Sequence, residues 1–363
     1  MIYRAIGLMS GSSLDGLDLA YVSFLEQGGK WSFTIEAAAT IPYEKDWLAQ
    51  LKSATELSAL EYQLLDASYG HYLGEKVNAF IEQHNLQFKV GLIASHGHTT
   101  FHMPSKGMTA QIGDGAAIAA QTELPVVSDL RALDVALGGQ GAPIVPIGEK
   151  LLFQGYQFFL NIGGIANISI QGEAYKAFDI CPANRVLNLL AGDAGKLFDE
   201  DGLLAKAGTV HKQLLNQLNE LDYYKQPIPK SLANEYGTDI VYPLLKASGL
   251  STQELLATYC YHIALQIKNS IILAGVEIKK DAKILVTGGG ALNQFLVQRI
   301  SEALKEIGVE LVIPEKQLIE YKEALIMAFI GVLRWRQEHN VLASVTGASR
   351  NSISGALWNG ESA

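Results

Sequence analysis

The chain has little cysteine, no long apolar run and no excess of positive charge. Its 363 residues include two cysteines, Cys181 and Cys260, which lie far apart in sequence. We therefore expect neither a disulfide framework nor a cysteine-based zinc site. Lysine and arginine number 28 against 37 aspartates and glutamates, and the formal net charge is −9. That balance argues against a nucleic-acid or anionic-membrane partner, whose binding surface is basic.

Signals for membrane insertion and secretion are also missing. No stretch approaches the roughly eighteen uninterrupted apolar residues of a spanning helix. The first residues lack the charged, apolar and small-residue regions of a signal peptide. The sequence predicts a soluble, cytoplasmic protein without a membrane partner.

The order of apolar segments indicates a two-domain α/β protein. Hydrophobic residues make up 48% of the chain, enough for buried sheets, and a chain of this length usually divides into two domains. Strand-like and helical segments alternate, and each half opens with a strand, a glycine turn and a second strand. We predict two related domains facing one another across a central cleft. One comprises residues 1–130 with 340–363, and the other residues 131–339.

The most informative stretch follows the first strand and reads Gly7-Leu-Met-Ser-Gly-Ser-Ser-Leu-Asp-Gly-Leu-Asp18. Glycine allows close backbone approach to a ligand, and successive N–H groups in such a turn bind anions. Asp15 and Asp18 favour a divalent cation between carboxylate and phosphate. A hairpin turn is the alternative, because glycine, serine and aspartate are ordinary turn residues.

Two later glycine turns also follow strands. Gly163-Gly164 comes after the strand 157–162, and Gly288-Gly-Gly290 comes after the strand 282–287. Ligands of open α/β sheets bind at such strand ends. The alternative is a tight packing turn.

Several single residues are candidates for chemistry. Asp179, predicted at the tip between the strand 174–178 and a helix, suits a general base, or else an N-terminal helix cap. His96, His98 and His102 fall in a predicted loop, 95–102, where hydrogen bonding is favoured over a zinc site.

Charged and nucleophilic candidates lie elsewhere. Arg131 suits a carboxylate or phosphate clamp, or a surface ion pair. Glu323, placed near the start of the predicted helix 322–337, suits either a ligand contact or the positive end of the helix dipole. Cys181 is favoured as a small packing residue over a nucleophile.

In this order, the motifs resemble those of the anhydro-N-acetylmuramic acid kinase family, within the superfamily of hexokinase, actin and the heat-shock ATPases. The resemblance runs from about residue 5 to about residue 350. The matching strings are Gly7–Asp18, Ser95-His-Gly97 with Thr99 and His102, Asp129-Leu-Arg131, Gly138-Gly-Gln-Gly-Ala-Pro143, Asn161-Ile-Gly-Gly-Ile-Ala-Asn167, Asp179 with Pro182 and Asn184, Thr287-Gly-Gly-Gly-Ala-Leu-Asn293, and Glu323-Ala324.

The resemblance implies a two-domain, actin-like (ribonuclease H-like) ATPase fold that uses ATP and Mg²⁺. The reaction it implies is hydrolytic opening of 1,6-anhydro-N-acetylmuramic acid, an amino sugar of cell-wall recycling, with phosphorylation at O6. Asp179 would activate the water, and Asp15 and Asp18 would face the metal. Sugar contacts would come from His96, Thr99, Arg131 and Glu323. The nucleotide-binding residues would be Gly11, Ser12, Ser13, Leu14, Asp15, Gly16, Leu17, Asp18, Gly163, Gly164, Asn167, Gly288, Gly289 and Gly290.

Three departures from the family pattern keep alternatives open. Ser12 stands for the usual threonine, Asp179-Ile-Cys-Pro182 for Asp-Thr-Gly-Pro, and His98 for glutamine. These changes are compatible with a kinase for a different sugar, or with a weakly active nucleotide-binding protein. A homodimer is also compatible with the sequence.

Overall fold

The computed structural model describes residues 1–11, 14–233 and 235–360, and it divides into two compact units. Unit 1 comprises Met1–Gln154 with Tyr321–Ala363, and unit 2 comprises Gly155–Glu320. Each is described by itself. Within the described residues, no helix is both long and apolar enough to cross a lipid bilayer.

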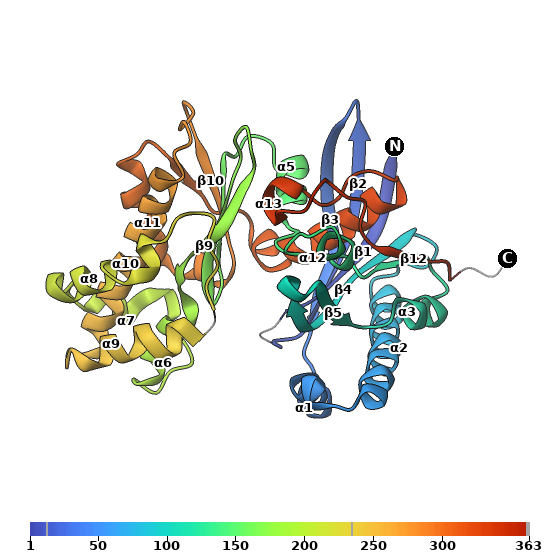
Figure 1. Ribbon diagram of the computed structural model, residues 1–363, viewed down its shortest axis with the longest axis horizontal. Helices are drawn as coiled ribbons and strands as arrows, with labels where there is room; N and C mark the ends of the chain where they lie inside the picture. Colours follow the sequence, from blue (N-terminus) through green and yellow to red (C-terminus); the bar gives the residue numbers. More distant parts are fainter. Residues whose placement is uncertain (12–13, 234, 361–363) are drawn as a thin grey trace. The chain divides into compact units, whose positions relative to one another are not determined.

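Unit 1 is built on a mixed sheet with the order β12-β6-β4-β1-β2-β3, and β5 pairs with β4 (Figure 1). The β1–β2 and β2–β3 pairs are antiparallel, whereas β4 runs parallel to both β1 and β6. Its strands are β1 (Ile2–Ser10), β2 (Leu17–Gln27), β3 (Lys30–Ile41), β4 (Leu92–Met103), β5 (Met108–Ile112), β6 (Val126–Ser128) and β12 (Ala356–Trp358).

The helices of unit 1 cover both faces of this sheet. One face packs on α2, where Leu65, Tyr69 and Val77 meet Ile6 and Leu8 of β1. The opposite face packs on α12. The helices are α1 (Lys45–Ser53), α2 (Ala59–Gln83), α3 (Gly115–Thr122), α4 (Ala132–Ala136), α5 (Pro146–Leu152), α12 (Lys316–Trp335, whose first residues belong to unit 2) and α13 (Ala343–Thr346).

Gly7 is a point of close approach between α12 and the sheet. A Cβ at this position would lie 1.9 Å from the carbonyl oxygen of Ala324 and 2.6 Å from the amide nitrogen of Ala328. Only glycine permits this approach of strand and helix. The first glycine of the predicted phosphate loop is therefore a packing glycine.

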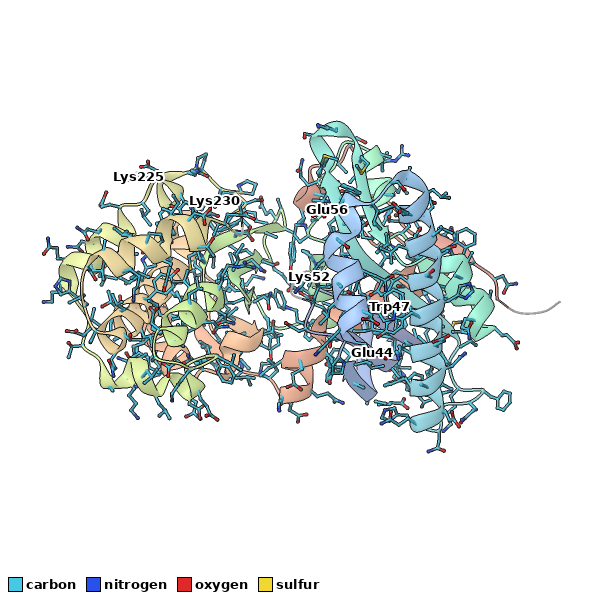
Figure 2. The ribbon with its side chains drawn as sticks, turned by 90° about the horizontal axis from the view of Figure 1, so that it is seen from below. Glu44, Trp47, Lys52, Glu56, Lys225 and Lys230 are labelled. Atoms are coloured by element: carbon cyan, nitrogen blue, oxygen red, sulfur yellow. The ribbon has the colours of Figure 1, made fainter. Side chains whose placement is uncertain are left out.

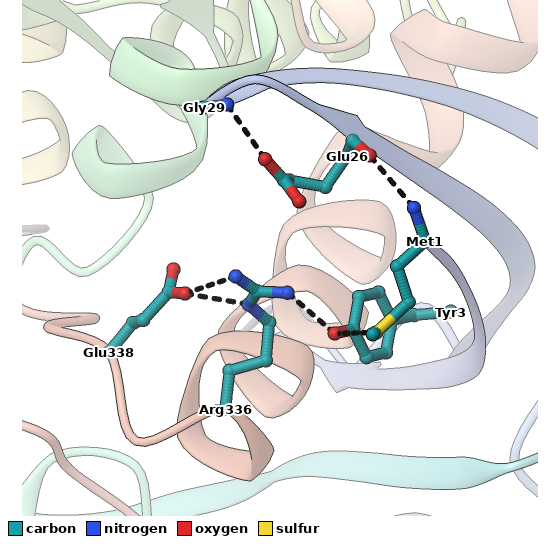
Figure 3. A network of polar contacts seen from close by, with 6 residues as sticks. All are labelled: Met1, Tyr3, Glu26, Gly29, Arg336 and Glu338. Atoms are coloured by element: carbon teal, nitrogen blue, oxygen red, sulfur yellow. Dashed lines mark hydrogen bonds and ion pairs between the residues drawn. The ribbon is translucent and has the colours of Figure 1, made fainter.

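The far end of α12 is tied to the beginning of the chain. The Arg336 guanidinium lies over the rings of Tyr3 and Trp31. Its Nε–H donates to Oε1 of Glu338 at 2.7 Å (Figure 3). The amino terminus of Met1 donates to the carbonyl of Glu26 at 2.9 Å (Figure 3). These contacts fix β1, whose other end leads into the 11–18 loop.

Unit 2 repeats the strand order of unit 1. Its sheet reads β11-β10-β7-β8-β9, with β7, β8 and β9 antiparallel and β10 parallel to both β7 and β11. Three antiparallel strands followed by parallel additions thus form the framework of both units. The duplicated order confirms the predicted actin-like α/β fold class. The strands are β7 (Phe158–Ile162), β8 (Ile165–Ile170), β9 (Lys176–Pro182), β10 (Lys283–Thr287) and β11 (Glu310–Val312).

A helical layer packs on the unit 2 sheet around α10, which is buried along most of its length. A capping box of Ser251 and Glu254 begins α10. The helices are α6 (Asn184–Gly192), α7 (Leu203–Ala207), α8 (Lys212–Asn219), α9 (Tyr242–Ala247), α10 (Thr252–Leu273) and α11 (Gln294–Lys305). The stretch between α6 and residue 233 contains α7 and α8.

The borders between units differ from the predicted ones at 130/131 and 339/340. The glycine-rich stretch 138–143 is not a linker, because the buried Asp134 accepts hydrogen bonds from the Gly141 amide (2.7 Å) and the Thr346 hydroxyl (2.7 Å). Most of α12 lies on the unit 1 sheet at Gly7. Residues 131–154 and 321–339 accordingly belong to unit 1.

Candidate functional site

In unit 2, the Gly163-Gly164 turn joins β7 to β8 and is tied to the start of α6. The amide of Asn184 donates to the Gly163 carbonyl at 3.0 Å, and the amide of Ala183 donates to the Gly164 carbonyl at 2.8 Å. The turn carbonyls thus satisfy backbone donors that a helix start leaves free. The turn is held rigidly against α6.

The second glycine turn of unit 2 lies against the first. Gly288 follows β10 with φ 82°, and a Cβ there would lie 2.5 Å from Oδ1 of Asn161 and 2.7 Å from the Ile162 carbonyl. A Cβ at Gly290 would lie 2.2 Å from Cγ2 of Ile162. The structure therefore brings Gly163, Gly164 and Gly288–Gly290 together at neighbouring strand ends. Each turn follows a strand, as the sequence predicted.

Asp179 lies inside β9, not at the tip of a strand before a helix. Its cross-strand neighbour is Asn167 of β8, and the register slips by one residue between this pair and the pair Ala166–Cys181. Such a bulge leaves one residue unpaired and re-aims the neighbouring side chain. Asp179 is therefore not a helix cap, and the predicted alternative of capping does not apply.

The Asp179 carboxylate is half-buried and held by one backbone donor. The amide of Leu232 donates to its Oδ2 at 2.8 Å. Its Oδ1 has no hydrogen-bond partner among the described residues. Burial raises the pKa of Asp179 above its usual value, and the Leu232 hydrogen bond opposes that rise. A carboxylate with a raised pKa and one open oxygen can act as a general base.

The two residues after Asp179 face the interior of unit 2. Ile180 and Cys181 are 1% and 0% exposed and belong to its hydrophobic core. Burial raises the pKa of the Cys181 thiol far above its usual value, so the thiolate needed for nucleophilic attack does not form. Cys181 is a packing residue, as expected.

In unit 1, the predicted phosphate loop joins β1 to β2. Ser12 and Ser13 lie outside the described residues. The amide of Leu14 donates to the Gly11 carbonyl at 3.2 Å, and a Cβ at Gly16 would lie 2.9 Å from the Ile41 carbonyl. Leu17 pairs with Ser10, and its side chain is buried in the core of unit 1. The predicted hairpin is confirmed by this β1–β2 pairing.

The two loop aspartates differ in their surroundings. Asp15 is exposed. Asp18, the second residue of β2, accepts a hydrogen bond from the Thr40 hydroxyl at 2.6 Å. In the described part of the chain, no three histidine, cysteine, aspartate or glutamate side chains group closely enough to enclose a metal.

Arg131 and His96 form a pair in unit 1, in which His96 is buried and Arg131 is half-buried. The Arg131 Nε–H donates to Nε2 of His96 at 2.9 Å, and Nη1 donates to the Gly141 carbonyl at 2.6 Å. His96 Nδ1 lies 2.9 Å from the Gly97 carbonyl, which can only accept, so Nδ1 carries the proton. Burial and the Arg131 charge lower the pKa of His96 to about 3, which keeps it neutral.

The hydrogen bonds of the Arg131 guanidinium go to an imidazole nitrogen and a backbone carbonyl, and among the described residues none goes to a carboxylate. Burial lowers the pKa of Arg131 to about 10, while the nearby charges of Glu323 and Asp134 oppose that fall. Arg131 remains a cation with donors to spare.

Glu323 lies in the middle of α12, because the helix begins at Lys316 and not at Lys322. The helix dipole acts on the first turn only, so it does not account for this carboxylate. Burial raises its pKa; Lys322 and Arg131 lower it, and Asp18 and Glu149 raise it further. Lys322 itself forms a buried ion pair with Glu149 at 2.7 Å.

The segment 95–102, predicted as a loop, continues strand β4. His98 is buried, and its Nδ1 lies 3.2 Å from the Ser10 hydroxyl, which accepts from the Tyr43 hydroxyl at 2.7 Å. His102 lies 3.0 Å from the Thr109 hydroxyl of β5, and Thr99 pairs with Gln111 of β5. The three histidines therefore have separate hydrogen-bond partners.

Two features near the unit 2 turns were not anticipated. Arg185 follows Asn184 in the first turn of α6, and its Nε would lie 3.7 Å from a Cβ at Gly164. A cation near a helix N-terminus opposes the helix dipole, so the position of Arg185 in the sequence could have indicated an anion-binding role. The Leu232 amide could not be found from the sequence, because a backbone donor does not depend on residue type.

The chain was compared with protein families and with individual proteins. The model of the family described as anhydro-N-acetylmuramic acid kinase matches residues 3–360. The chain is 32% identical over 367 residues to an anhydro-N-acetylmuramic acid kinase of Sulfurovum sp. (strain NBC37-1), covering 98% of this chain and 99% of that protein.

Solved structures give weaker matches. An activator of the 2-hydroxyisocaproyl-CoA dehydratase from Clostridium difficile with bound ADPNP matches with a TM-score of 0.44 and 13% identity, over 92% of this chain and 96% of that one. Component A of the Acidaminococcus fermentans (R)-2-hydroxyglutaryl-CoA dehydratase matches with a TM-score of 0.44 and 17% identity, over 91% and 97%.

Proposed function

Because the chain belongs to the anhydro-N-acetylmuramic acid kinase family, it is an ATP-dependent sugar kinase, and we propose that Asp179 is the base that activates water in its reaction. The proposed substrate is 1,6-anhydro-N-acetylmuramic acid, and the product is N-acetylmuramic acid 6-phosphate. The observation that carries the proposal is the half-buried Asp179 carboxylate, with its raised pKa and one open oxygen.

The bond changes assign a definite task to this carboxylate. Asp179 Oδ1 takes a proton from water while the water oxygen bonds to C1 of the sugar. As the water oxygen attacks, the C1–O6 bond breaks and its electron pair goes to O6. ATP, when bound, would supply the phosphoryl group that O6 accepts, and ADP would be released. A positioned general base accelerates such a step by roughly 10²–10⁴-fold.

The glycine turns of unit 2 suit the nucleotide. Side chains are absent where Gly163, Gly164 and Gly289 face outward, so phosphate oxygens can approach the backbone closely. Arg185 places a guanidinium beside Gly164, where it can donate to the same oxygens. We assign Arg185 to phosphate binding, together with Asn167 of the following strand.

Unit 1 suits an anionic sugar. N-acetylmuramic acid carries a carboxylate, and Arg131 offers a half-buried charge whose hydrogen bonds go to the neutral His96 ring and the Gly141 carbonyl. An arginine held this way binds a carboxylate with good geometry. We assign Arg131 to that carboxylate, and Glu323, His96 and Thr99 to the surrounding polar contacts.

Magnesium is proposed at the 11–18 loop. Mg²⁺ usually keeps several waters and takes one or two protein carboxylates beside substrate phosphates, so a closed cage of side chains is not required. Asp15 is exposed and Asp18 stands at the start of β2, which suits contact through water. Their task is to neutralise phosphate charge.

A kinase for another sugar is the second candidate, raised by Ile180, Cys181 and His98. The positions of these side chains speak against it, because Ile180 and Cys181 lie in the core and His98 is hydrogen-bonded to Ser10. The departures from the family pattern therefore change packing more than substrate contacts.

Isotope labelling tests the proposed reaction. In H₂¹⁸O, the product should carry one ¹⁸O, bonded to C1, and an unlabelled phosphate on O6. Label found only in released inorganic phosphate would mean that water attacks ATP. Phosphorylated sugar without ¹⁸O would exclude opening of the anhydro bridge by water. Either result would contradict the proposal.

A further inference from the structure

A short segment of unit 2 crosses the outer edge of β9 at Asp179. We call residues 230–232 the strap. The amide of Asp179 donates to the Lys230 carbonyl at 3.0 Å, and the amide of Leu232 donates to Oδ2 of Asp179 at 2.8 Å. Because β9 is the last strand of its sheet, this edge is open to such pairing.

Tyr223 completes the enclosure of Asp179. Its hydroxyl donates to the Asp179 carbonyl at 2.8 Å, and its side chain is only 4% exposed. The Lys230 ammonium donates to the Tyr223 carbonyl at 2.9 Å and lies 4.3 Å from the centroid of the tyrosine ring. Lys230 is labelled in Figure 2, as is Lys225, five residues earlier in the chain. The three residues form a closed set of contacts.

We propose that the strap, anchored by Tyr223, is the positioning device of the base: it holds Oδ2 and presents Oδ1 of Asp179 to water. The inference rests on the proposed function of Asp179. One carboxylate oxygen, the amide and the carbonyl of Asp179 all meet the segment 223–232, whereas Oδ1 meets no hydrogen-bond partner in the described chain. The carboxylate cannot rotate without losing the Leu232 bond.

Of the groups around Asp179, the Leu232 amide of the strap is the one whose removal should change the pKa of Asp179. Burial raises the pKa of both Tyr223 and Cys181, which interact with the Asp179 charge and stay neutral while Asp179 titrates. Lys230 is the cation of the strap, and burial lowers its pKa. The hydrogen bond from Leu232 opposes the effect of burial on Asp179, so its removal should raise the pKa of the base.

Leu232→Pro removes the N–H, and Leu232→Ala keeps it as the matched control. We expect the acid limb of kcat to move up by about one pH unit in Leu232→Pro, with kcat lowered roughly tenfold or more and the KM for ATP unchanged. Leu232→Ala should keep the wild-type pH profile. Equal profiles in the two folded variants would overturn the proposal.

Two further measurements guard against misfolding and against failure of the proposed reaction. Tyr223→Phe, which keeps the ring, should lower kcat without moving the pH midpoint, because the lost donor contacts the backbone. A wild-type kcat in this variant would contradict the anchoring role.

Carboxyl ¹³C titration, assigned with Asp179→Asn, measures the titration midpoint of Asp179 without turnover. The Asp179 midpoint should rise in Leu232→Pro even if the anhydro-sugar is not the substrate. An unchanged midpoint would contradict the positioning role of the strap and leave the proposed reaction unaffected.

Discussion

The Nε–H of Arg131 donates to Nε2 of His96 at 2.9 Å, and this contact sets the state of both side chains. His96 must be neutral to accept, and its second ring nitrogen is committed to the Gly97 carbonyl. The histidine therefore orients the half-buried Arg131 cation and leaves the remaining guanidinium donors for a ligand. A metal role for His96 is incompatible with these two bonds, because both ring nitrogens are occupied.

Removing the imidazole acceptor should weaken sugar binding specifically. His96→Phe leaves a buried Arg131 N–H without an acceptor, at a cost of about 1–3 kcal/mol. We expect the KM for the sugar to rise by roughly tenfold, the equivalent of about 1.4 kcal/mol, with the KM for ATP unchanged. Steady-state kinetics with each substrate varied in turn measure this. His96→Gln, which restores an acceptor, should recover part of the loss; equal defects for both substrates would argue against a sugar-side role.

Activity should fall at acid pH earlier than for an ordinary aspartate. Burial raises the pKa of Asp179 above 3.8, and a base works only when deprotonated. As pH decreases through the raised pKa, kcat should therefore decrease while the protein remains folded. A pH profile of kcat, with circular dichroism at each pH, measures this. A profile flat down to the ordinary aspartate range would contradict the assignment.

Arg185 should matter for the nucleotide and not for the sugar. Its guanidinium lies beside Gly164, and hydrogen bonds to charged groups contribute about 1.5–3 kcal/mol. Arg185→Ala should raise the KM for ATP by roughly tenfold or more. Arg185→Lys keeps the charge and should lie between. An unchanged KM for ATP in the alanine variant would remove Arg185 from the phosphate site.

Gly7→Ala tests packing and not phosphate binding. The new Cβ would lie 1.9 Å from a backbone oxygen of α12, so strand and helix must separate. Overpacking of this kind costs about 1–3 kcal/mol or more, and urea unfolding should show it. Gly192→Ala is the control, because no atom lies within 4 Å of the added methyl at the end of α6. Equal midpoints for the two variants would contradict the packing role.

Cys181→Ala should keep sugar-dependent activity. The thiol is fully buried in the unit 2 core and its pKa is raised, so it contributes packing alone. We expect a loss of about 1 kcal/mol in the free energy of unfolding and a kcat close to wild type. Loss of turnover by a stably folded variant would show that Cys181 takes part in the reaction.

The sequence was a good guide to residues that follow strands. Gly163, Gly164 and Gly288 were found because glycine marks places where the backbone approaches another group, and the duplicated strand–turn–strand pattern predicted the repeated sheet order. These signals are local. They depend on residue type and spacing, which the printed sequence contains.

Other features depended on tertiary structure and were missed or misplaced. The sequence places Asp179 at a strand tip, whereas the structure places it inside β9 beside a bulge. The bulge depends on how β9 pairs with β8, and the sequence of one strand does not reveal that pairing. The sequence places Glu323 near a helix start because four of the seven helical residues before it, 316–322, are polar or charged and interrupt the apolar pattern. The glycine-rich composition of 138–143 does not reveal that Asp134 holds this stretch through the Gly141 amide.

The most direct test of the account is sugar-dependent ATP consumption by wild type and Asp179→Asn, with Mg²⁺ and 1,6-anhydro-N-acetylmuramic acid. The wild-type protein should consume ATP only when the anhydro-sugar is present and should form the 6-phosphate in equal amount. Asp179→Asn should fold normally and lose this turnover by roughly 10²-fold or more. A folded Asp179→Asn protein with near wild-type turnover would contradict the central claim that Asp179 is the base.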